Sequence, residues 1–198
     1  MPEVAIDSIC RRDDLRMYNK TQAGFTLLEM IAVIVIAAIM VTMAIPSLAT
    51  FIKNNRMTTQ INDFVATANI ARMEAIKRGQ RVVVCKSTDT NTCIATGRWD
   101  QGWIAFVDAN TDGTHDAAED IISSHDALVS GSTFTGYDEV ANTFYFNANG
   151  SSNLTGYGEM VLCDDRKNTS ISKAITLNPV GRVETINASE AAATHQCS

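Results

Sequence analysis

The stretch that decides the fold is Gly24-Phe25-Thr26-Leu27-Leu28-Glu29, followed by the run MIAVIVIAAIMVTMAI that ends at Ile45. Only Thr42 is polar among the sixteen residues of that run, and Glu29 is the sole charge between Phe25 and Ile45. These twenty-one residues are enough to cross a bilayer as a helix. The sequence therefore predicts one membrane-spanning helix near the N-terminus.

Two ordinary explanations of this apolar stretch stay open. It could be a secretory signal peptide that is cut after Ser47-Leu48-Ala49, although the run is longer than a normal signal core and Glu29 interrupts its start. It could also be a plain membrane anchor that tolerates Glu29 near its end. Ionisable residues within a membrane are, however, more often functional than idle, which favours a third explanation.

The motif at residues 24–29 follows a polar leader that ends in Lys20-Thr21-Gln22-Ala23. This arrangement resembles the cleavage and assembly signature of type IV prepilins and of the pseudopilins of type II secretion. The resemblance implies that residues 1–24 are a leader and that a prepilin peptidase cuts between Gly24 and Phe25. It also implies methylation of the new amine, which gives N-methylphenylalanine.

Glu29 becomes the fifth residue of the mature chain in this interpretation, as the family pattern requires. An ionised carboxylate in a membrane costs about 2.5–3.5 kcal/mol on insertion scales unless it finds a partner. Phe25 and Glu29 lie four residues apart, on one face of the expected helix, but in a filament Glu29 can instead neutralise the Phe25 amine of a neighbouring subunit. Such a pair would favour assembly and set its register.

Beyond the apolar run, Pro46 is expected to produce a kink or a melted turn, because proline removes a helical hydrogen bond. The resembling family carries a proline at the same place, so Pro46 joins the assembly residues. Apolar side chains then recur at three- and four-residue steps from Ile61 to Ile76, and Gly79 is a fitting stop. We expect one helix over residues 25–78, of which residues 25–45 form the membrane or filament-core part.

Residues 79–198 change to a β-type pattern and are expected to form a globular head. Short β-type runs occur at residues 81–85, 102–108, 143–147, 159–163 and 173–177. The predicted fold class is α+β, with an antiparallel sheet packed on the long helix. The segment from Trp99 to Asn110 with the acidic loop after it resembles the minor pilins and pseudopilins of the GspH and FimT type, which implies a pilin fold.

Composition supports one exported domain with an anchor. The 198 residues carry a formal net charge of −6, 19% charged and 45% hydrophobic side chains, so neither a disordered chain nor a polytopic membrane protein fits. Long basic runs are missing from the sequence, which argues against a surface made for nucleic acid. The resemblance implies a bacterial inner-membrane protein with a single span and a periplasmic domain, which later enters a pilus or pseudopilus.

Four of the five cysteines follow the leader, and export would oxidise them. Four cysteines allow three pairings. We favour Cys85 with Cys93, which closes a polar loop, and Cys163 with Cys197, which ties the C-terminal tail to a strand. Loop entropy assigns these bonds about 2.6 and about 3.8 kcal/mol.

Residues 108–119 fit a calcium-loop string. Asp108, Asn110, Asp112 and Glu119 stand at the ligand positions around Gly113. The string follows a strand instead of a helix, and the same residue types build ordinary tight turns. Bound calcium is therefore an alternative to an acidic turn, and no other cofactor is indicated.

The functional expectation is a structural subunit, not an enzyme. His115, His125 and His195 are isolated in sequence, and no catalytic motif is recognised. An anchored periplasmic enzyme would require a deep polar pocket. The partners implied by the resemblance are other major and minor pilins or pseudopilins, the prepilin peptidase and the inner-membrane assembly platform, with a role in initiation or at the filament tip.

A DNA receptor for transformation is the alternative function. Some FimT-like minor pilins bind DNA through a C-terminal Gly-Arg-x-Arg motif. The comparable stretch here is Gly181-Arg182-Val183-Glu184, which places an acid at the second arginine position. An anion beside the phosphate path should weaken binding, so Arg182 alone remains as a candidate DNA contact.

Overall fold

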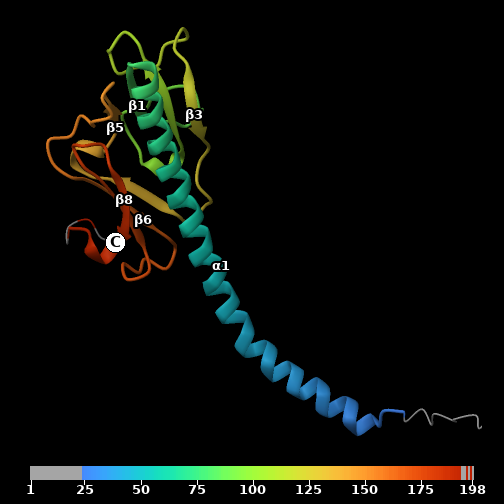
Figure 1. Cartoon of the computed structure of the whole chain (residues 1–198). Helices are drawn as coiled ribbons and strands as arrows, with labels where there is room; N and C mark the ends of the chain where they lie inside the picture. The colour runs from blue at the N-terminus through green and yellow to red at the C-terminus, as the bar shows by residue number, and fades with distance from the viewer. Residues whose placement is uncertain (1–23, 193–194, 196, 198) are drawn as a thin grey trace, which may run out of the picture. The chain divides into compact units, whose positions relative to one another are not determined.

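The computed structural model describes residues 24–192, 195 and 197. Within these residues it contains the helix α1 (Leu27–Arg78), eight strands and the short 3-10 helices η1 (Trp99–Gln101), η2 (Asp138–Val140) and η3 (Ala188–Glu190). Figure 1 shows the strands beside the C-terminal part of α1. The chain divides into an N-terminal unit that ends at Ile45 and a second unit that begins at Pro46. Each unit is described by itself.

The N-terminal unit is helical from Leu27 onwards, and its side chains are exposed. The Thr26 hydroxyl accepts a hydrogen bond from the backbone N–H of Glu29 at 3.2 Å, and the Thr26 carbonyl accepts one from Met30 at 3.2 Å. Thr26 therefore acts as the N-cap, which satisfies one of the free donors of the first turn. Because the helix begins after Thr26, the expectation that Phe25 and Glu29 share one helical face is wrong.

Of the two outcomes expected at Pro46, a kink or a melted turn, the melted turn is wrong, because the backbone is helical at this residue and on both sides of it. The Thr50 hydroxyl donates to the Pro46 carbonyl at 3.1 Å, so this carbonyl has a polar partner. Proline removes only the bond that its own nitrogen would donate, and the flanking bonds hold the helix together.

The second half of α1 buries one face against the strands. Steps of three and four residues separate its buried apolar side chains, which are Met57, Ile61, Phe64, Ala68, Ala71 and Ala75. The three alanines allow the strands to approach the helix axis closely. The helix ends at Arg78, as predicted, because Gly79 adopts φ +64° and the N–H of Gln80 donates to the Ala75 carbonyl at 3.2 Å.

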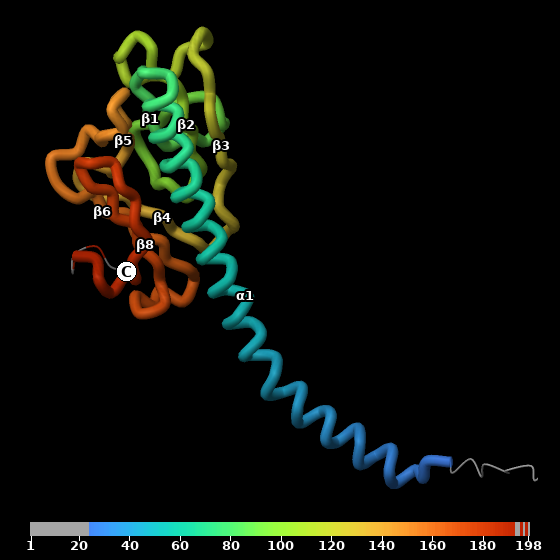
Figure 2. The backbone as a smooth tube through the Cα atoms, in the orientation of Figure 1, coloured from blue at the N-terminus to red at the C-terminus, as the bar shows by residue number. Residues whose placement is uncertain are grey.

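The strands form two four-stranded antiparallel sheets in place of one. The first has the order β3-β2-β1-β5 and contains β1 (Arg81–Lys86), β2 (Trp103–Asp108), β3 (Ile121–His125) and β5 (Thr143–Phe146). The second has the order β4-β6-β7-β8 and contains β4 (Thr133–Gly136), β6 (Gly158–Cys163), β7 (Lys173–Leu177) and β8 (Val183–Asn187). Figure 2 shows β1, β2 and β3 beside the last turns of α1.

Three strands were not predicted, and all three are sheet edges: β3, β4 and β8. Edge strands have one neighbour and bury little, so their side chains show no regular apolar alternation. In β8, for example, no residue is fully buried. The five predicted strands match the observed ones to within one residue at each end.

The core joins the helix to both sheets through Phe64. Its ring meets Trp99, Trp103, Phe134 and Phe144 with centroid distances of 5.3, 5.1, 5.0 and 6.2 Å. Both buried indoles have polar partners, since Trp99 Nε1 donates to the Val140 carbonyl at 3.0 Å and Trp103 Nε1 donates to Thr67 Oγ1 at 3.1 Å. The head is therefore fixed on one side of α1 by aromatic packing.

Candidate functional site

The apolar segment is the first candidate site. Its large side chains are exposed, from Phe25 at 77% to Ile45 at 61%, and α1 is the one helix among the described residues that is long and apolar enough to cross a membrane. Exposure of this extent requires a covering partner, either lipid or protein. The predicted cleavage residue Gly24 precedes this segment, and the rest of the predicted leader lies outside the described residues.

Glu29 lies in the first turn of α1, where the helix dipole favours a negative charge. Within residues 24–192, 195 and 197, no basic group lies within ion-pair distance of its carboxylate. Its backbone N–H is capped by Thr26, which the sequence analysis missed although the T-x-x-E spacing signals a capping box.

The predicted calcium ligands do not converge. The Asp108 carboxylate accepts hydrogen bonds from Arg81 Nε at 2.7 Å and from the Gly113 N–H at 3.0 Å. Glu119 accepts one from the Ala109 N–H at 2.9 Å. Among the residues that the structure describes, no group of three or more His, Cys, Asp or Glu side chains could hold a metal ion.

The two remaining calcium candidates are also used within the loop. Asn110 Nδ2 donates to Asp112 Oδ2 at 2.9 Å, and Asp112 Oδ1 accepts from the Thr114 N–H at 2.7 Å. That last contact is the largest of several that lower the pKa of Asp112. As arranged, the loop does not fit a calcium coordination shell, and its oxygens order an acidic turn.

The candidate DNA contact lies in the turn between β7 and β8. Arg182 is exposed and forms an ion pair with Glu184 at 2.5 Å. Gly181, which precedes it, has φ +82°, and a side chain there would collide with the Gly150 carbonyl. Arg72 of α1 ties this turn to the helix by donating to the carbonyls of Gly150 and Val180 at 2.9 and 3.0 Å. The glycine of the predicted motif therefore has a packing role, and its arginine is partly neutralised.

Both favoured disulfides are present. Cys85 is bonded to Cys93, and Cys163 is bonded to Cys197, with Cα–Cα distances of 5.6 and 5.8 Å. In the loop closed by the first bond, Asp89 accepts hydrogen bonds from the backbone of Thr92 and Asn91, which lower the pKa of its carboxyl group well below the usual range. The second bond holds the C-terminal tail on β6.

The three histidines all bind other parts of the head. His115 contacts the carbonyls of Asn91 and Glu119, and His125 stacks on Trp103 with ring centroids 4.2 Å apart. His195 stacks on Tyr137 at 3.9 Å and its Nδ1 lies 2.8 Å from Glu159. These contacts link the loops and the tail to the strands.

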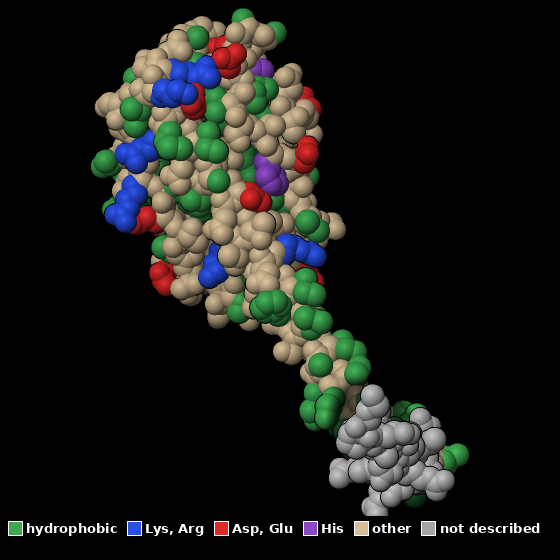
Figure 3. All heavy atoms as spheres, turned by 45° about the vertical axis from the view of Figure 1, so that its right-hand side comes forward, with side chains coloured by type: hydrophobic (Ala, Val, Ile, Leu, Met, Phe, Trp, Pro, Cys, Tyr) green, Lys and Arg blue, Asp and Glu red, His purple; other side chains and the backbone are tan. Residues whose placement is uncertain are grey.

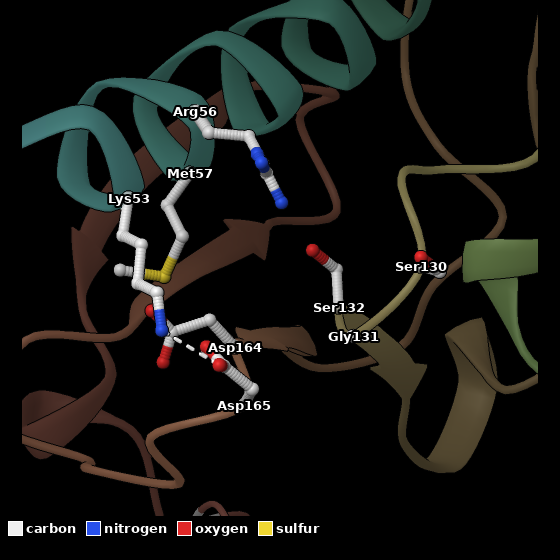
Figure 4. Close-up of a pocket in the computed structure, with 8 residues that line it drawn as sticks. All are labelled: Lys53, Arg56, Met57, Ser130, Gly131, Ser132, Asp164 and Asp165. Atoms are coloured by element: carbon white, nitrogen blue, oxygen red, sulfur yellow. Dashed lines mark hydrogen bonds and ion pairs between the residues drawn. The ribbon is translucent and has the colours of Figure 1, made fainter. Parts of the chain in front are cut away.

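A small cavity of about 80 Å³ lies between α1 and two loops, which contribute residues 130–132 and residues 164–165 (Figure 4). Lys53, Arg56 and Met57 approach it from the helix, and Asp164 and Asp165 approach it from the loop after β6. Lys53 Nζ reaches Asp165 Oδ2 at 2.6 Å, whereas the Arg56 side chain is drawn without an ion-pair partner. The cavity is too small for an ordinary substrate.

Comparison with protein families supports this description. Residues 60–181 match the family described as type II transport protein GspH, and residues 19–45 match the prokaryotic N-terminal methylation motif. The first match covers the last part of α1 and the head as far as the turn before β8, and the second covers the segment from the end of the polar leader to Ile45. Comparison with curated proteins gave no match.

Two solved structures have a similar fold. One is the type IV minor pilin FimU of Pseudomonas aeruginosa PAO1, with 19% identity, a TM-score of 0.58, and 75% of this chain and 99% of that chain covered. Another is the minor pseudopilin EpsH from the type II secretion system of Vibrio cholerae, with 10% identity, a TM-score of 0.50, and coverage of 68% and 98%. At these identities the likeness concerns the fold, a long helix with a C-terminal antiparallel sheet domain.

Proposed function

The chain belongs to the GspH family of type II transport proteins, and on this premise we propose that it is a minor pilin or pseudopilin subunit that is processed, anchored and then assembled into a filament. Pilins and pseudopilins are structural proteins. The proposed location is the inner membrane, with residues 25–45 as the single span and the head in the periplasm. From there the subunit would enter a type IV pilus or a type II secretion pseudopilus, in an initiating or tip position.

The observation that carries this proposal is the exposed apolar segment with its single charge. The side chains of residues 25–45 are exposed in the part of the chain that the structure describes, although residues 27–45 form a regular helix. A lipid bilayer covers the apolar side chains of this segment before assembly, and the helices of neighbouring subunits cover them afterwards. Both environments have the same apolar character, so transfer from one to the other needs little hydrophobic work.

In this proposal, Glu29 makes the transfer of the helix from the bilayer to the filament specific. Cleavage after Gly24 by a prepilin peptidase would create a positively charged amine on Phe25, and methylation would leave that charge in place. Because α1 starts at Leu27, the Phe25 amine lies outside the regular helix and can reach the Glu29 carboxylate of a neighbouring pilin. A buried charge that gains an opposite partner becomes far less costly than one left alone.

Processing is tested by the intact mass and the N-terminal residue of the protein isolated from membranes. The comparison uses hosts with and without a prepilin peptidase. We expect a chain that begins at N-methylated Phe25 only in the host that has the enzyme. A chain that begins after Ala49, or one that keeps Met1 in both hosts, would reject the proposed maturation.

Assembly is tested by Glu29→Gln, with Thr42→Val as the matched control on the same helix. Glu29→Gln removes the charge and keeps a polar side chain of nearly the same size, so the variant should enter the membrane at least as well as the wild type. It should nevertheless be missing from the sheared filament fraction. Its contacts with its pilin partners and with the assembly platform should be lost as well. Wild-type amounts of Glu29→Gln in filaments would refute the role of the charge.

DNA reception remains the alternative function and has less support. The Arg182 guanidinium already pairs with Glu184, and Figure 3 shows basic and acidic side chains intermixed on the face in view. A gel-shift assay at low and moderate salt tests this alternative. Salt-sensitive binding that disappears in Arg182→Ala would establish it.

A further inference from the structure

The head carries a basic rim at the end where α1 enters it. The rim consists of residues 53–56 of α1 and residues 164–173, which are the loop between β6 and β7 and the first residue of β7. Its basic side chains are Lys53, Arg56, Arg166, Lys167 and Lys173. These two segments contain two acidic side chains, Asp164 and Asp165, so the rim has three positive charges in excess, although the whole chain has a net charge of −6.

Contacts between the two segments hold the rim together. Lys53 pairs with Asp165 at 2.6 Å, and Arg166 Nη2 donates to Asn54 Oδ1 at 2.9 Å. Asn54 and Lys173 also line one shallow depression beside the helix. Residues more than a hundred positions apart therefore form one surface, which the linear sequence does not reveal.

Part of this positive charge is not neutralised within the head. Arg56, Lys167 and Lys173 have no ion pair in the part of the chain that the structure describes. Arg56 and Lys167 are exposed. Lys173 Nζ donates to Asn187 Oδ1, and Asn187 Nδ2 donates to Glu190 Oε1, so the Glu190 carboxylate is connected to Lys173 only through Asn187.

The covalent chain keeps the rim near the end of the apolar segment. Lys53 follows Ile45 by eight residues, which span about 12 Å in a helix. The headgroup layer extends roughly 5–8 Å beyond the hydrocarbon on each side of a bilayer. Electrostatic attraction reaches about 8 Å further at physiological salt. Whatever the angle between helix and membrane, Lys53, the first cation of the rim, stays within that reach.

Apolar side chains fill the interval between the span and the rim. Leu48, Phe51 and Ile52 are all more than half exposed. A short apolar continuation followed by Lys and Arg is the order in which the interfacial and headgroup layers of a membrane are met. Both the sequence order and the assembled rim thus match the surface of an anionic bilayer.

We propose that the basic rim binds anionic phospholipid headgroups on the periplasmic surface of the membrane in which the chain is anchored. This inference rests on the proposed function, because it requires residues 25–45 to lie in the bilayer. The contact holds the head against the membrane before assembly. This contact must break when the subunit leaves the bilayer, so it favours the membrane-anchored subunit over the subunit assembled in the filament.

The test uses the full mature chain reconstituted into vesicles of phosphatidylcholine alone and into vesicles that also contain phosphatidylglycerol. Flotation measures insertion, and hydrogen–deuterium exchange of residues 164–173 measures contact of the rim. We expect insertion in both kinds of vesicle, with slower exchange only where phosphatidylglycerol is present and reversal of that effect by salt.

The decisive variants are Arg56→Glu and Lys167→Glu, each made singly, and the matched control is Lys77→Glu, the same charge change near the other end of α1. Each substitution removes one cation and adds one anion, so it should lower the ratio of bound to unbound rim by at least about fivefold, and the control should leave it unchanged. Insertion with equal exchange in both vesicles would overturn the lipid contact alone. Failure to float in either vesicle would overturn the anchoring proposal and this inference with it.

Discussion

Phe64→Ala is the sharpest test of the packing that positions the head. The Phe64 side chain is 1% exposed, and its ring contacts four aromatic rings from η1, β2, β4 and β5. Truncation of such a phenylalanine removes its burial and leaves a cavity that rigid neighbouring rings cannot fill. We expect a loss of about 4 kcal/mol in the free energy of unfolding.

The assay is urea unfolding with the disulfides intact, followed by the fluorescence of Trp99 and Trp103, which both contact the Phe64 ring. The midpoint should fall without a change in the slope m, because the native fold is retained. Met73→Ala on the exposed face of α1 is the control, with an expected loss below about 0.5 kcal/mol. A loss for Phe64→Ala of less than about 1.5 kcal/mol would refute the idea that this ring joins the helix to both sheets.

Three further outcomes are expected. Arg81→Gln should lower the free energy of unfolding by about 3 kcal/mol, since it leaves the buried Asp108 carboxylate without its cation; urea unfolding should show partial recovery when Asp108→Asn is added, and no recovery would contradict the pairing. The depressed pKa of Asp89 means that its charged form stabilises the fold above about pH 4 and that this stability is lost as the pH falls through the lower native value. Unfolding measured from neutral to acidic pH should therefore be less pH-dependent in Asp89→Asn than in the wild type. Millimolar calcium should leave the melting temperature unchanged, whereas a site filled at about 100 times its Kd would add about 2.7 kcal/mol of stability.

The fold class followed from local patterns, and so did most element boundaries. The helix end at Gly79 was predictable because a left-handed residue there closes the last turn through a local hydrogen bond. Central strands such as β1 and β6 were predictable because burial on two sides selects apolar residues. The edge strand β8 was not, because its structure depends on pairing with β7 and not on its own composition.

In the candidate sites, too, contacts between distant segments decided what the local pattern left open. The string at residues 108–119 fits calcium as a list of residue types, yet the arrangement across the β1–β2 pair places Arg81 opposite Asp108 and supplies a cation from the protein itself. Likewise, the close approach of the Gly150 carbonyl leaves no room for a side chain at Gly181, and Arg72 donates from the helix to the carbonyls of Gly150 and Val180. Each of these facts depends on a contact between segments far apart in the sequence.

By itself, the sequence determined the apolar segment, its single charge at Glu29 and the helix that carries both, because hydrophobicity and helical periodicity act between near neighbours. It also favoured the cysteine pairing that the structure shows, although it left all three pairings possible. Only the tertiary structure decided the division into two sheets, the aromatic contacts of Phe64 and the basic rim. These features arise from packing and charge proximity between distant segments, which no local pattern encodes.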